Sequence, residues 1–360
     1  MTKTRLVLLT VLLLCGCSCK PASGPALRGD QRALTDMAGR AVVVPRTITH
    51  VMGMSPVATV MIYTLSPELL AGWNNQPNPA ELAFIHKPYR HLPVLGGWYG
   101  KNNTGNLEEI VKAHPDVLIS MGDPQGIAVA DRVQQQIHIP VVFLSGDLKK
   151  LPDAYLKAAE LLGNPARAAE LATECRGTLQ EIETKINAIP LAKRRRVYYA
   201  EGPAGMETEP STSIHSEALQ FAGAANVAAV PGQQGYGHTP VSMEQILAWD
   251  PEVVISGYEH SGAPGEFYRS VWTNAAWRHV HAVKDHQVYE APQYAFGWSD
   301  RPPSVNRIIG IRWIANLLYP DLFHDDMRVA TRQFYARFYR LQLSDAELDQ
   351  ILATATRESQ

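Results

Sequence analysis

Histidine, aromatic and basic side chains gather in five short stretches of the chain, GGWYGKNNTG, STSIHSEA, GYGH, YEHS and YAFGWSDRPP. Glycine, serine and proline surround them, which is typical of loops, and loops often carry binding residues on a rigid scaffold. An aromatic ring can stack on a large planar or chelated ligand, and a lysine or arginine can face its anionic groups. An imidazole can complete the coordination of a metal. These stretches therefore predict a site that captures a ligand.

The candidate ligand-binding residues come from these stretches and from the ends of expected strands, where the loops of an α/β protein begin. They are Met54, Trp73, Trp98, Tyr99, Lys101, His215, Tyr236, His238, His260, Trp298 and Arg301. Neighbouring loop positions add Met52, Asn74, Met121, Asp123, Glu259, Tyr294 and Phe296. Each of these interpretations has an alternative. Each histidine could instead have a surface or capping role, and Trp98 and Trp298 could instead pack in the core. The stretch GGWYGKNNTG could be only a turn-rich connection.

Common catalytic motifs are absent from the sequence, which has no GxGxxG after a strand, no P-loop, no HExxH and no GxSxG. The lack of HExxH and of a tight acid–base pair disfavours the main rival function, a periplasmic metal-dependent hydrolase. We expect neither catalysis nor a resident cofactor. Whether a histidine coordinates a metal of the ligand stays open.

Short apolar strands alternate with helices from about residue 36 to 145, with strands at PVLGG, DVLIS and PVVFLS and a first helix at SPVATVMIYTL. This alternation is typical of a parallel sheet. Residues 151–189 are helical, with an interruption near residues 163–165, and the second part would reach roughly 35 Å at about 1.5 Å per residue. The α/β pattern resumes at Arg194. We expect two Rossmann-like α/β lobes with mainly parallel sheets, joined by one long rigid α-helix, with the ligand cleft between the lobes.

One block of the sequence is written twice. LEEIVKAHPDVLIS, residues 107–120, returns as MEQILAWDPEVVIS, residues 243–256, at an offset of 243 − 107 = 136 residues. That offset exceeds the roughly 20–50 residues of solenoid repeats and is about the size of a small domain. Each copy has helical spacing, a proline that ends the helix, and a β-branched run that suits a buried parallel strand. The repeat predicts two similar lobes, although helix–proline–strand is also a common α/β device.

The composition is that of a globular protein with the length of about two domains: 360 residues, 46% hydrophobic and 19% charged. A formal net charge of −2 disfavours nucleic acid as the main partner. After residue 20 no stretch approaches the roughly 20 apolar residues of a membrane span.

The N-terminus resembles a bacterial lipoprotein signal. A basic MTKTR precedes an apolar run at residues 6–14, and LCGC at residues 14–17 resembles a lipobox with Cys17 as the lipid acceptor. A plain signal peptide cut elsewhere is the alternative. Lipidation would tether the mature chain to a bacterial membrane surface and leave it otherwise soluble.

These signals predict the organisation of the chain. We expect a lipoprotein signal peptide at residues 1–16, a flexible tether at 17–35, an N-terminal α/β lobe at 36–148, an interlobe helix at 149–190 and a C-terminal α/β lobe at 191–360.

The lipobox, the NLEEIV…PDVLI block, the long helix and the SMEQILAWDPEVVI block together resemble the helical-backbone (class III) substrate-binding proteins of ABC importers. The resemblance covers nearly the whole mature chain. It implies that Glu108 and Glu244 dock on arginines of a two-fold permease dimer, whose two like patches match two pseudo-equivalent carboxylates. The alternative is that both are ordinary solvated carboxylates near helix N-termini.

We therefore expect a monomeric, lipid-anchored periplasmic or cell-surface receptor that binds no nucleic acid. By the resemblance, it delivers a metal complex of the iron–siderophore, haem or corrinoid type to an ABC permease dimer and its ATPase. The alternative ligands within the class are molybdate or tungstate and a nickel or cobalt chelate. An oxyanion predicts backbone amides and hydroxyls at the site in place of aromatic rings, and a stiff interlobe helix predicts small closing motions.

Replacing Cys17 by serine tests the anchor. We expect Cys17→Ser to leave the membrane fraction for the soluble extracytoplasmic fraction, because the variant has no thiol at the lipobox position to carry lipid. Fractionation of cells with quantitative blotting measures this, and a Cys19→Ser variant is the control that should stay with the membrane. Retention of Cys17→Ser in the membrane fraction would show that the lipobox prediction is wrong.

Overall fold

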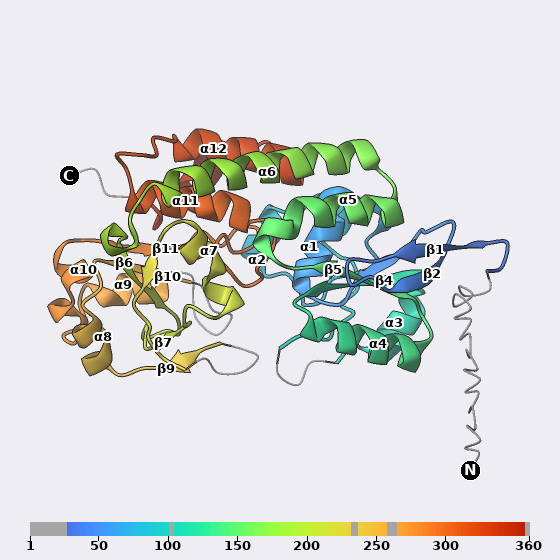
Figure 1. The fold of residues 1–360 in the computed structure, drawn as a ribbon, viewed down its shortest axis with the longest axis horizontal. Helices are drawn as coiled ribbons and strands as arrows, with labels where there is room; N and C mark the ends of the chain where they lie inside the picture. The colour runs from blue at the N-terminus through green and yellow to red at the C-terminus, as the bar shows by residue number, and fades with distance from the viewer. Residues whose placement is uncertain (1–26, 101–103, 232–236, 258–264, 357–360) are drawn as a thin grey trace, which may run out of the picture.

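The computed structural model describes residues 27–100, 104–231, 237–257 and 265–356. Two α/β lobes lie side by side, and a layer of helices covers both of them (Figure 1). The predicted fold class is confirmed. The predicted lipid acceptor Cys17 lies outside the described residues. In the described part of the chain, no helix is both long enough and apolar enough to span a membrane.

The N-terminal lobe is built on a parallel sheet of three strands in the order β3-β4-β5. Its strands are β3 (Val51–Gly53), β4 (Val117–Gly122) and β5 (Val141–Ser145). An antiparallel hairpin of β1 (Gln31–Thr35) and β2 (Ala41–Pro45) precedes the sheet. The sequence analysis did not expect this hairpin, whose first strand falls within the predicted tether.

The helices of this lobe begin with α1, which has Ser55 at the N-cap and Pro56 in the first turn and lies within the predicted helical segment SPVATVMIYTL. The helical elements are α1 (Pro56–Leu65), α2 (Pro79–Ala83), α3 (Leu107–Ala113) and α4 (Gln125–Ile137), with 3-10 turns η1 (Pro67–Leu69), η2 (Lys87–Tyr89) and η3 (Leu148–Lys150). The predicted strand at PVLGG is absent, and this segment forms only isolated bridges. Gly96 takes a positive φ of 69° there, which interrupts an extended strand.

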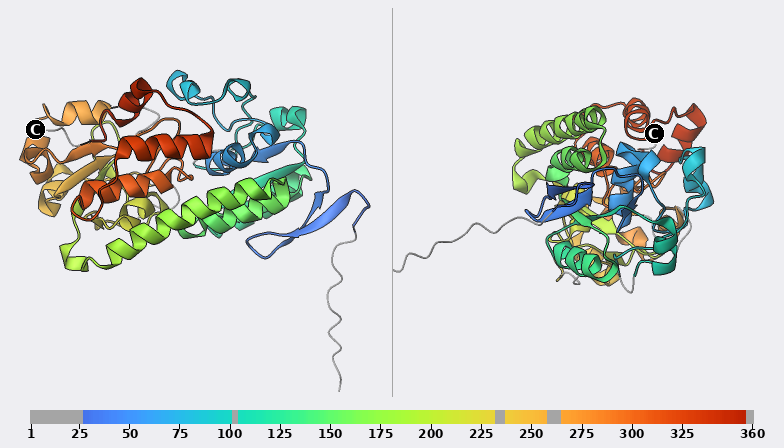
Figure 2. Two further views of the ribbon diagram at one scale, coloured as in Figure 1. Left: turned by 90° about the horizontal axis from the view of Figure 1, so that it is seen from above. Right: turned by 90° about the vertical axis from the view of Figure 1, so that its right-hand side faces the viewer.

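Two helices, α5 (Leu151–Leu162) and α6 (Pro165–Asn187), connect the lobes. Gly163 and Asn164 break the helical segment with φ values of 80° and 63°. The two helices therefore run side by side (Figure 2) instead of end to end. The long helix α6 buries Leu171, Cys175 and Ile182 at intervals of four and seven residues, which places them on one face.

The C-terminal lobe repeats the architecture with a parallel sheet in the order β11-β10-β6-β8. Its strands are β6 (Arg196–Ala200), β8 (Ala225–Asn226), β10 (Val253–Ser256) and β11 (Val288–Glu290), beside an antiparallel pair of β7 (Glu207–Thr208) and β9 (Thr239–Pro240). Its helical elements are η4 (Leu191–Lys193), η5 (Ile214–Ser216), α7 (Glu217–Phe221), α8 (Met243–Trp249), α9 (Glu266–Val271), η6 (Trp277–His279) and α10 (His281–Lys284). The segment HAVKDHQVYEAP forms α10 followed by β11.

The repeated sequence block forms the same unit in both lobes. Helix α3 ends at His114 with φ 43°, and α8 ends at Asp250 with φ 45°. Each capping N–H donates to the carbonyl of a buried isoleucine, Ile110 or Ile246. The parallel strands β4 and β10 follow three residues later. The predicted helix-to-strand unit is confirmed in each copy.

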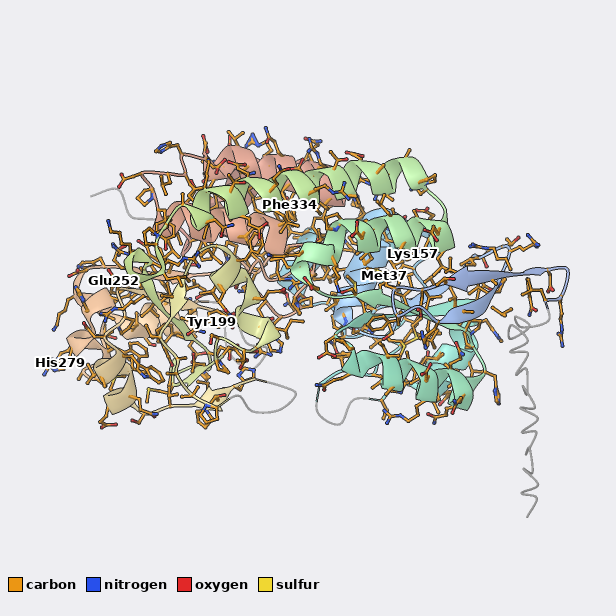
Figure 3. All side chains as sticks on the ribbon, viewed as in Figure 1. Met37, Lys157, Tyr199, Glu252, His279 and Phe334 are labelled. Atoms are coloured by element: carbon orange, nitrogen blue, oxygen red, sulfur yellow. The ribbon has the colours of Figure 1, made fainter. Side chains whose placement is uncertain are left out.

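One hydrophobic core passes through both lobes. Alternate strand residues such as Ile119 in β4 and Ile255 in β10 face this core, while Leu118 and Val254 face smaller cores on the opposite sides of their sheets. Side chains fill the space between the helix layer and the sheets (Figure 3). The two lobes therefore fold on a shared interior.

The C-terminal helices add a second link between the lobes. They are α11 (Arg307–Leu318), α12 (Met327–Phe334), the π-helical turn η7 (Tyr335–Tyr339) and α13 (Asp345–Leu352). Tyr339 packs 6.1 Å from the ring of Tyr63 in α1, and its carbonyl lies 2.7 Å from His86 Nε2. The chain thus returns to the N-terminal lobe, because the apolar faces of α1 and η7 cover each other. The lobes are joined by more than the expected single helix.

Truncating Tyr339 tests this second link. We expect Tyr339→Ala to lower the free energy of unfolding by about 3–5 kcal/mol, because it removes a buried ring packed between the lobes. Chemical denaturation measures the loss. Val329→Ala, an exposed position in the preceding helix, should change stability by less than about 0.5 kcal/mol. Equal small losses in both variants would contradict the prediction.

Candidate ligand-binding cleft

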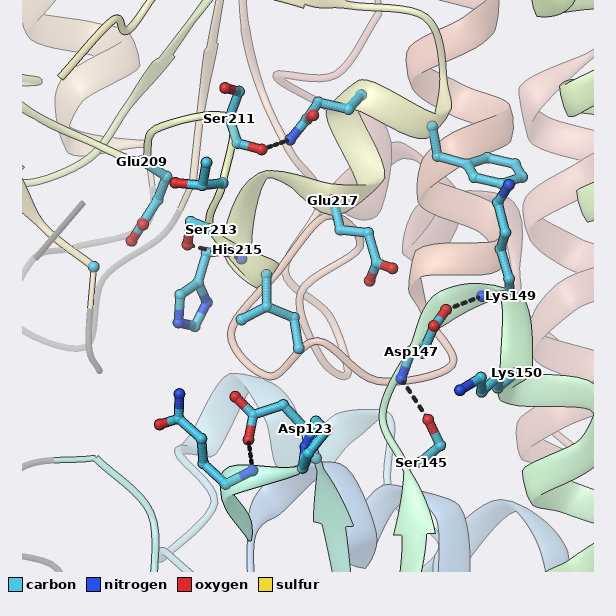
Figure 4. Close-up of a pocket in the computed structure, with 18 of the residues that line it drawn as sticks. Asp123, Ser145, Asp147, Lys149, Lys150, Glu209, Ser211, Ser213, His215 and Glu217 are labelled. Atoms are coloured by element: carbon cyan, nitrogen blue, oxygen red, sulfur yellow. Dashed lines mark hydrogen bonds between the residues drawn. The ribbon is translucent and has the colours of Figure 1, made fainter. Parts of the chain in front are cut away.

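A cleft of about 1200 Å³ lies between the two lobes. The N-terminal lobe lines it with the ends of β4 and β5 and the turns after them, and the C-terminal lobe lines it with residues 209–215 and α7 (Figure 4). The C-terminal end of α6 completes the lining. The strands of a parallel sheet all end at one edge, and loops at that edge of two sheets meet here, as the sequence analysis expected.

Backbone contacts fix the N-terminal wall of the cleft. The N–H of Gly146 donates to the carbonyl of Gly122 at 2.8 Å, and a Cβ on Gly146 would lie only 2.9 Å from the Cα of Gly122. Asp123 Oδ1 accepts from the N–H of Gln125 at 2.9 Å at the start of α4. Asp147 Oδ1 accepts from the N–H of Lys149 at 2.9 Å. The turns after both strands are therefore held in place before a ligand arrives.

His215 stands on the C-terminal wall and points across the cleft toward the N-terminal wall near Asp123 (Figure 4). Its Nδ1 lies 2.6 Å from Oδ1 of the buried Asp300. Burial by itself would lower the pKa of His215, but the Asp300 carboxylate outweighs it and raises that pKa above its ordinary value. Burial likewise raises the pKa of Asp300, and His215 and Arg301 outweigh it, so that pKa is lowered. The pair favours an imidazolium whose second nitrogen, Nε2, is not engaged by Asp300.

A single guanidinium contacts three buried carboxylates behind this histidine. Arg301 Nε and Nη2 donate to Glu201 Oε1 at 3.0 and 2.9 Å, and Nη2 donates to Glu209 Oε1 at 2.8 Å. Arg301 Nε also lies 3.5 Å from Asp300 Oδ2. Burial raises the pKa of Glu201, and the balance of Arg301 against the neighbouring carboxylates leaves it at about 7. Near neutral pH the cluster therefore holds part of a proton.

His238 extends the same cluster. Its ring nitrogen Nδ1 lies 2.9 Å from Glu207 Oε2 and 3.7 Å from Glu201 Oε2. Its backbone N–H donates to Glu209 Oε1 at 3.1 Å. The preceding Gly237 lines the cleft, and a Cβ there would overlap Glu209 Oε1. The absence of a side chain at that position lets the loop lie against the buried carboxylate.

Cations pair with Glu183 and Glu217, two of the carboxylates that line the cleft itself. Lys149 Nζ lies 2.6 Å from Glu183 Oε1, and the guanidinium of Arg307 pairs with Glu217. Burial raises the pKa of Glu217, and Arg307 partly offsets that effect. Lys150 also lines the cleft, and its ammonium group forms no ion pair with the described residues.

Hydroxyl groups are frequent on the lining and aromatic rings are few. Ser145 contributes one hydroxyl from the N-terminal wall, and Ser211, Thr212 and Ser213 line the C-terminal wall (Figure 4). Among the described residues, the only aromatic carbocycles on the lining are those of Phe143 and Phe221. The arrangement offers hydrogen-bond donors to an oxygen-rich solute and little surface for stacking.

The structure brings together three of the predicted ligand-binding residues, His215, His238 and Arg301, and of these three only His215 lines the cleft. Trp98 and Tyr99 lie elsewhere in the N-terminal lobe and do not line this cleft. The indole of Trp98 packs where a Cβ of Gly105 would be, and the Tyr99 hydroxyl donates to Asn75 Oδ1 at 2.8 Å. Trp98 and Tyr99 therefore do not belong to the cluster formed by His215, His238 and Arg301.

Other predicted residues belong to the interior. Trp298 is 0% exposed, and its Nε1 donates to the Tyr335 hydroxyl at 3.2 Å, so the expectation that it faces the cleft is wrong. Trp73 is also buried, and its Nε1 donates to the carbonyl of Tyr89. Further buried candidates are Met52, Met54, Asn74 and Met121, while Tyr294 and Phe296 pack partly buried against the main core. Lys101, Tyr236, Glu259 and His260 lie outside the described residues.

Most of the acidic residues at the site were not among the residues predicted from the sequence. These are Glu201, Glu207, Glu209, Glu217 and Asp300, together with Arg307. Glu201 comes directly after β6 in YYAEG, and its position after a strand was a usable signal. The others belong to turns, to a helix start or, for Glu207, to the short strand β7, and no local pattern marks them. Among the described residues, no group of three histidine, cysteine or acidic side chains is placed to hold a metal ion.

Comparisons with known proteins place this geometry in context. A family model described as periplasmic binding protein matches residues 98–295. A solved ABC transporter solute binding protein from Sulfurospirillum deleyianum superposes with a TM-score of 0.83 at 33% identity, covering 89% of this chain and 99% of that chain.

The names of two relatives state a ligand. The molybdate-binding protein MolA of Haemophilus influenzae is 26% identical over 360 residues, covering 91% of this chain and 96% of that protein. The high-affinity heme uptake system protein IsdE of Staphylococcus aureus is 24% identical over 228 residues, covering 61% of this chain and 73% of that protein.

Removing the guanidinium of Arg301 tests the carboxylate cluster. We expect Arg301→Ala to lower the free energy of unfolding at pH 8 by about 3–5 kcal/mol, because three buried carboxylates lose their cation. The loss should shrink at pH 6. A carboxyl whose pKa is raised on folding stabilises the protein below its unfolded value and loses that contribution as pH rises through its folded value, about 7 for Glu201.

Urea denaturation at both pH values measures this effect. Arg332→Ala, which removes an exposed partner of Asp345, is the matched control and should cost at most about 1 kcal/mol at either pH. An equal loss for Arg301→Ala at pH 6 and pH 8 would contradict the proton-sharing cluster.

Proposed function

Because this chain belongs to the periplasmic binding protein family, we propose that its interlobe cleft captures a metal oxyanion of the molybdate or tungstate type for an ABC importer. Proteins of the family bind solutes outside the cytoplasm and work with an ABC permease and ATPase. The chain is therefore a solute-binding protein and not an enzyme. The identity of the solute and the lipid anchor at Cys17 are parts of the proposal.

The observation that carries the choice of ligand is the set of donors on the cleft lining. Serine and threonine hydroxyls come from both walls, and His215 adds a ring nitrogen whose partner Asp300 favours the imidazolium. Charge-assisted N–H donors and hydroxyls are the groups that bind an oxyanion, as backbone amides do. A lining of hydroxyls in place of aromatic rings is the one expected for an oxyanion.

The relatives support the same choice. The match to the molybdate-binding protein covers 91% of this chain, while the match to the heme uptake protein covers 61%. Haem or a corrinoid needs broad apolar and aromatic surface. Trp73 and Trp298, which would have offered that surface, are buried in the core.

A second candidate is a metal held by a small acidic organic chelator, and the size of the cleft favours it. A bare oxyanion occupies on the order of 100 Å³, a few times the ~30 Å³ share of a water molecule. The cleft of about 1200 Å³ has room for more. The ammonium of Lys150 would face acidic groups of the chelator, and Nε2 of His215 would complete the coordination of the metal, oriented by Asp300.

Docking to the permease is the remaining part of the proposal. Glu108 and Glu244 both lie in the first turn of their helices, and both are exposed. Glu108 Oε1 lies 3.0 Å from Lys112 Nζ, whereas the equivalent position on α8 is Ala248, so the two carboxylates differ in their neighbours. Two exposed carboxylates, one on each lobe, suit the two like patches of a permease dimer.

Titration calorimetry with sodium molybdate and sodium tungstate tests the ligand. We expect both anions to bind, with affinity that falls as pH rises through the pKa of His215, because the imidazolium is lost. His215→Ala should weaken binding about tenfold or more, since a hydrogen bond to a charged group contributes roughly 1.5–3 kcal/mol, and should flatten the pH dependence. His324→Ala, an exposed histidine away from the cleft, should bind as the native protein does.

The outcomes separate the two candidates. Binding of an iron or molybdenum hydroxycarboxylate complex without binding of the free oxyanions would favour the chelate. Binding of neither, or full affinity in His215→Ala, would overturn the assignment of the ligand to this part of the cleft.

A further inference from the structure

Val111 and Leu247 occupy equivalent positions in the repeated block. They are separated by 247 − 111 = 136 residues, the same offset that relates Glu108 to Glu244. Each lies three residues after its glutamate on α3 or α8, and side chains three residues apart are neighbours on one face of a helix. Each lobe thus presents one carboxylate beside one aliphatic side chain.

Both aliphatic side chains face solvent. Val111 is 64% exposed and Leu247 is 39% exposed. The residues just before them, Ile110 and Ile246, are buried and attach each helix to its lobe. Packing in the core therefore does not explain why Val111 and Leu247 are apolar, because the buried isoleucine already attaches each helix to its lobe.

This pairing is not a general property of exposed apolar residues in the protein. The other large exposed aliphatic residues of the described chain are Leu27, Leu107, Leu156, Leu191, Ile214, Leu322 and Val329. Shifting these by 136 residues in either direction reaches no other member of the set. Among the described residues, Val111 and Leu247 are the one pair in which both copies of the repeat expose a large aliphatic side chain.

We propose that Val111 and Leu247 are apolar contact points for the two halves of the permease dimer, each beside its docking carboxylate. The inference rests on the proposed docking of Glu108 and Glu244 and adds the groups that hold the complex together. Rim charges mainly steer encounter and set salt dependence, whereas desolvated apolar side chains mainly slow dissociation. A monomer with two similar points needs a partner with two similar patches, which a two-fold permease supplies.

A second copy of this chain is a poorer occupant for the same surface. A face-to-face dimer through these points would bring acidic patches against each other, because Glu108, Glu109 and Glu244 surround the aliphatic side chains and Lys112 is the only basic residue on the two helices. Like charges in an interface oppose association. Charge complementarity therefore favours a permease that presents basic residues.

The test uses the purified full chain, its importer reconstituted in nanodiscs, and biolayer interferometry with ATPase stimulation. We expect Val111→Ser and Leu247→Ser each to speed dissociation severalfold, and the double variant to weaken docking at least tenfold. The salt dependence of association should stay as in the native protein. Val329→Ser and Leu322→Ser, exposed aliphatic positions without a repeat counterpart, should dock normally.

Glu108→Ala and Glu244→Ala are run in parallel so that two failures can be told apart. If the glutamate variants lose docking and its salt dependence while the Val111/Leu247 double variant docks normally, the aliphatic contact is wrong and the proposed docking stands. If neither set changes docking, the docking face itself is wrong. If the native chain dimerises in sedimentation and the double variant is monomeric, the occupant is a second copy and the inference is overturned.

Discussion

The guanidinium of Arg307 is fully buried, so its N–H groups need partners inside the protein. It finds them on both sides of the interlobe boundary, in Glu217 at the start of α7 and in the carbonyl of Gly146 after β5, 2.7 Å away. Separating a buried charge from its partners costs several kcal/mol. The lobes therefore have a fixed meeting point beside the cleft, and the orientation of one lobe relative to the other follows from it.

The continuous core and the helix layer also hold the two lobes in a fixed relative orientation. Helix α6 spans the boundary on one side, and Tyr339 returns to Tyr63 of the N-terminal lobe on the other. A cleft between lobes fixed at several points exists before the ligand enters. Hydroxyls, His215 and the cations on its walls are therefore preorganised, which lowers the entropic cost of capture.

The C-terminal wall illustrates how buried charges organise a site. Arg301 forms ion pairs with both Glu201 and Glu209, and this cluster lies directly behind the His215–Asp300 pair. Excess negative charge in this cluster favours the protonated imidazole, which is the form that attracts an anion. The outer surface is organised differently. Helices α3 and α8 expose the same arrangement of a glutamate and an aliphatic residue on both lobes, which suits a partner with two-fold symmetry.

The sequence by itself determined the local units. Periodicity and proline placement gave α1, the α3–β4 and α8–β10 units and the parallel strands, because these features depend on neighbouring residues. The break at Gly163 was visible for the same reason, whereas the β1–β2 hairpin was not. The sequence also marked His215, His238 and Arg301 as residues able to bind.

Only the tertiary structure decided which of the marked residues pack in the core and which lie on or behind the cleft wall. Trp298 and Arg301 stand three residues apart in one loop, yet the first packs in the core and the second contacts Glu201, 100 residues away in sequence. Loop composition cannot distinguish these outcomes. Whether a side chain is buried or faces the ligand depends on contacts between segments distant in the chain, and those contacts exist only after both lobes have packed on their common core.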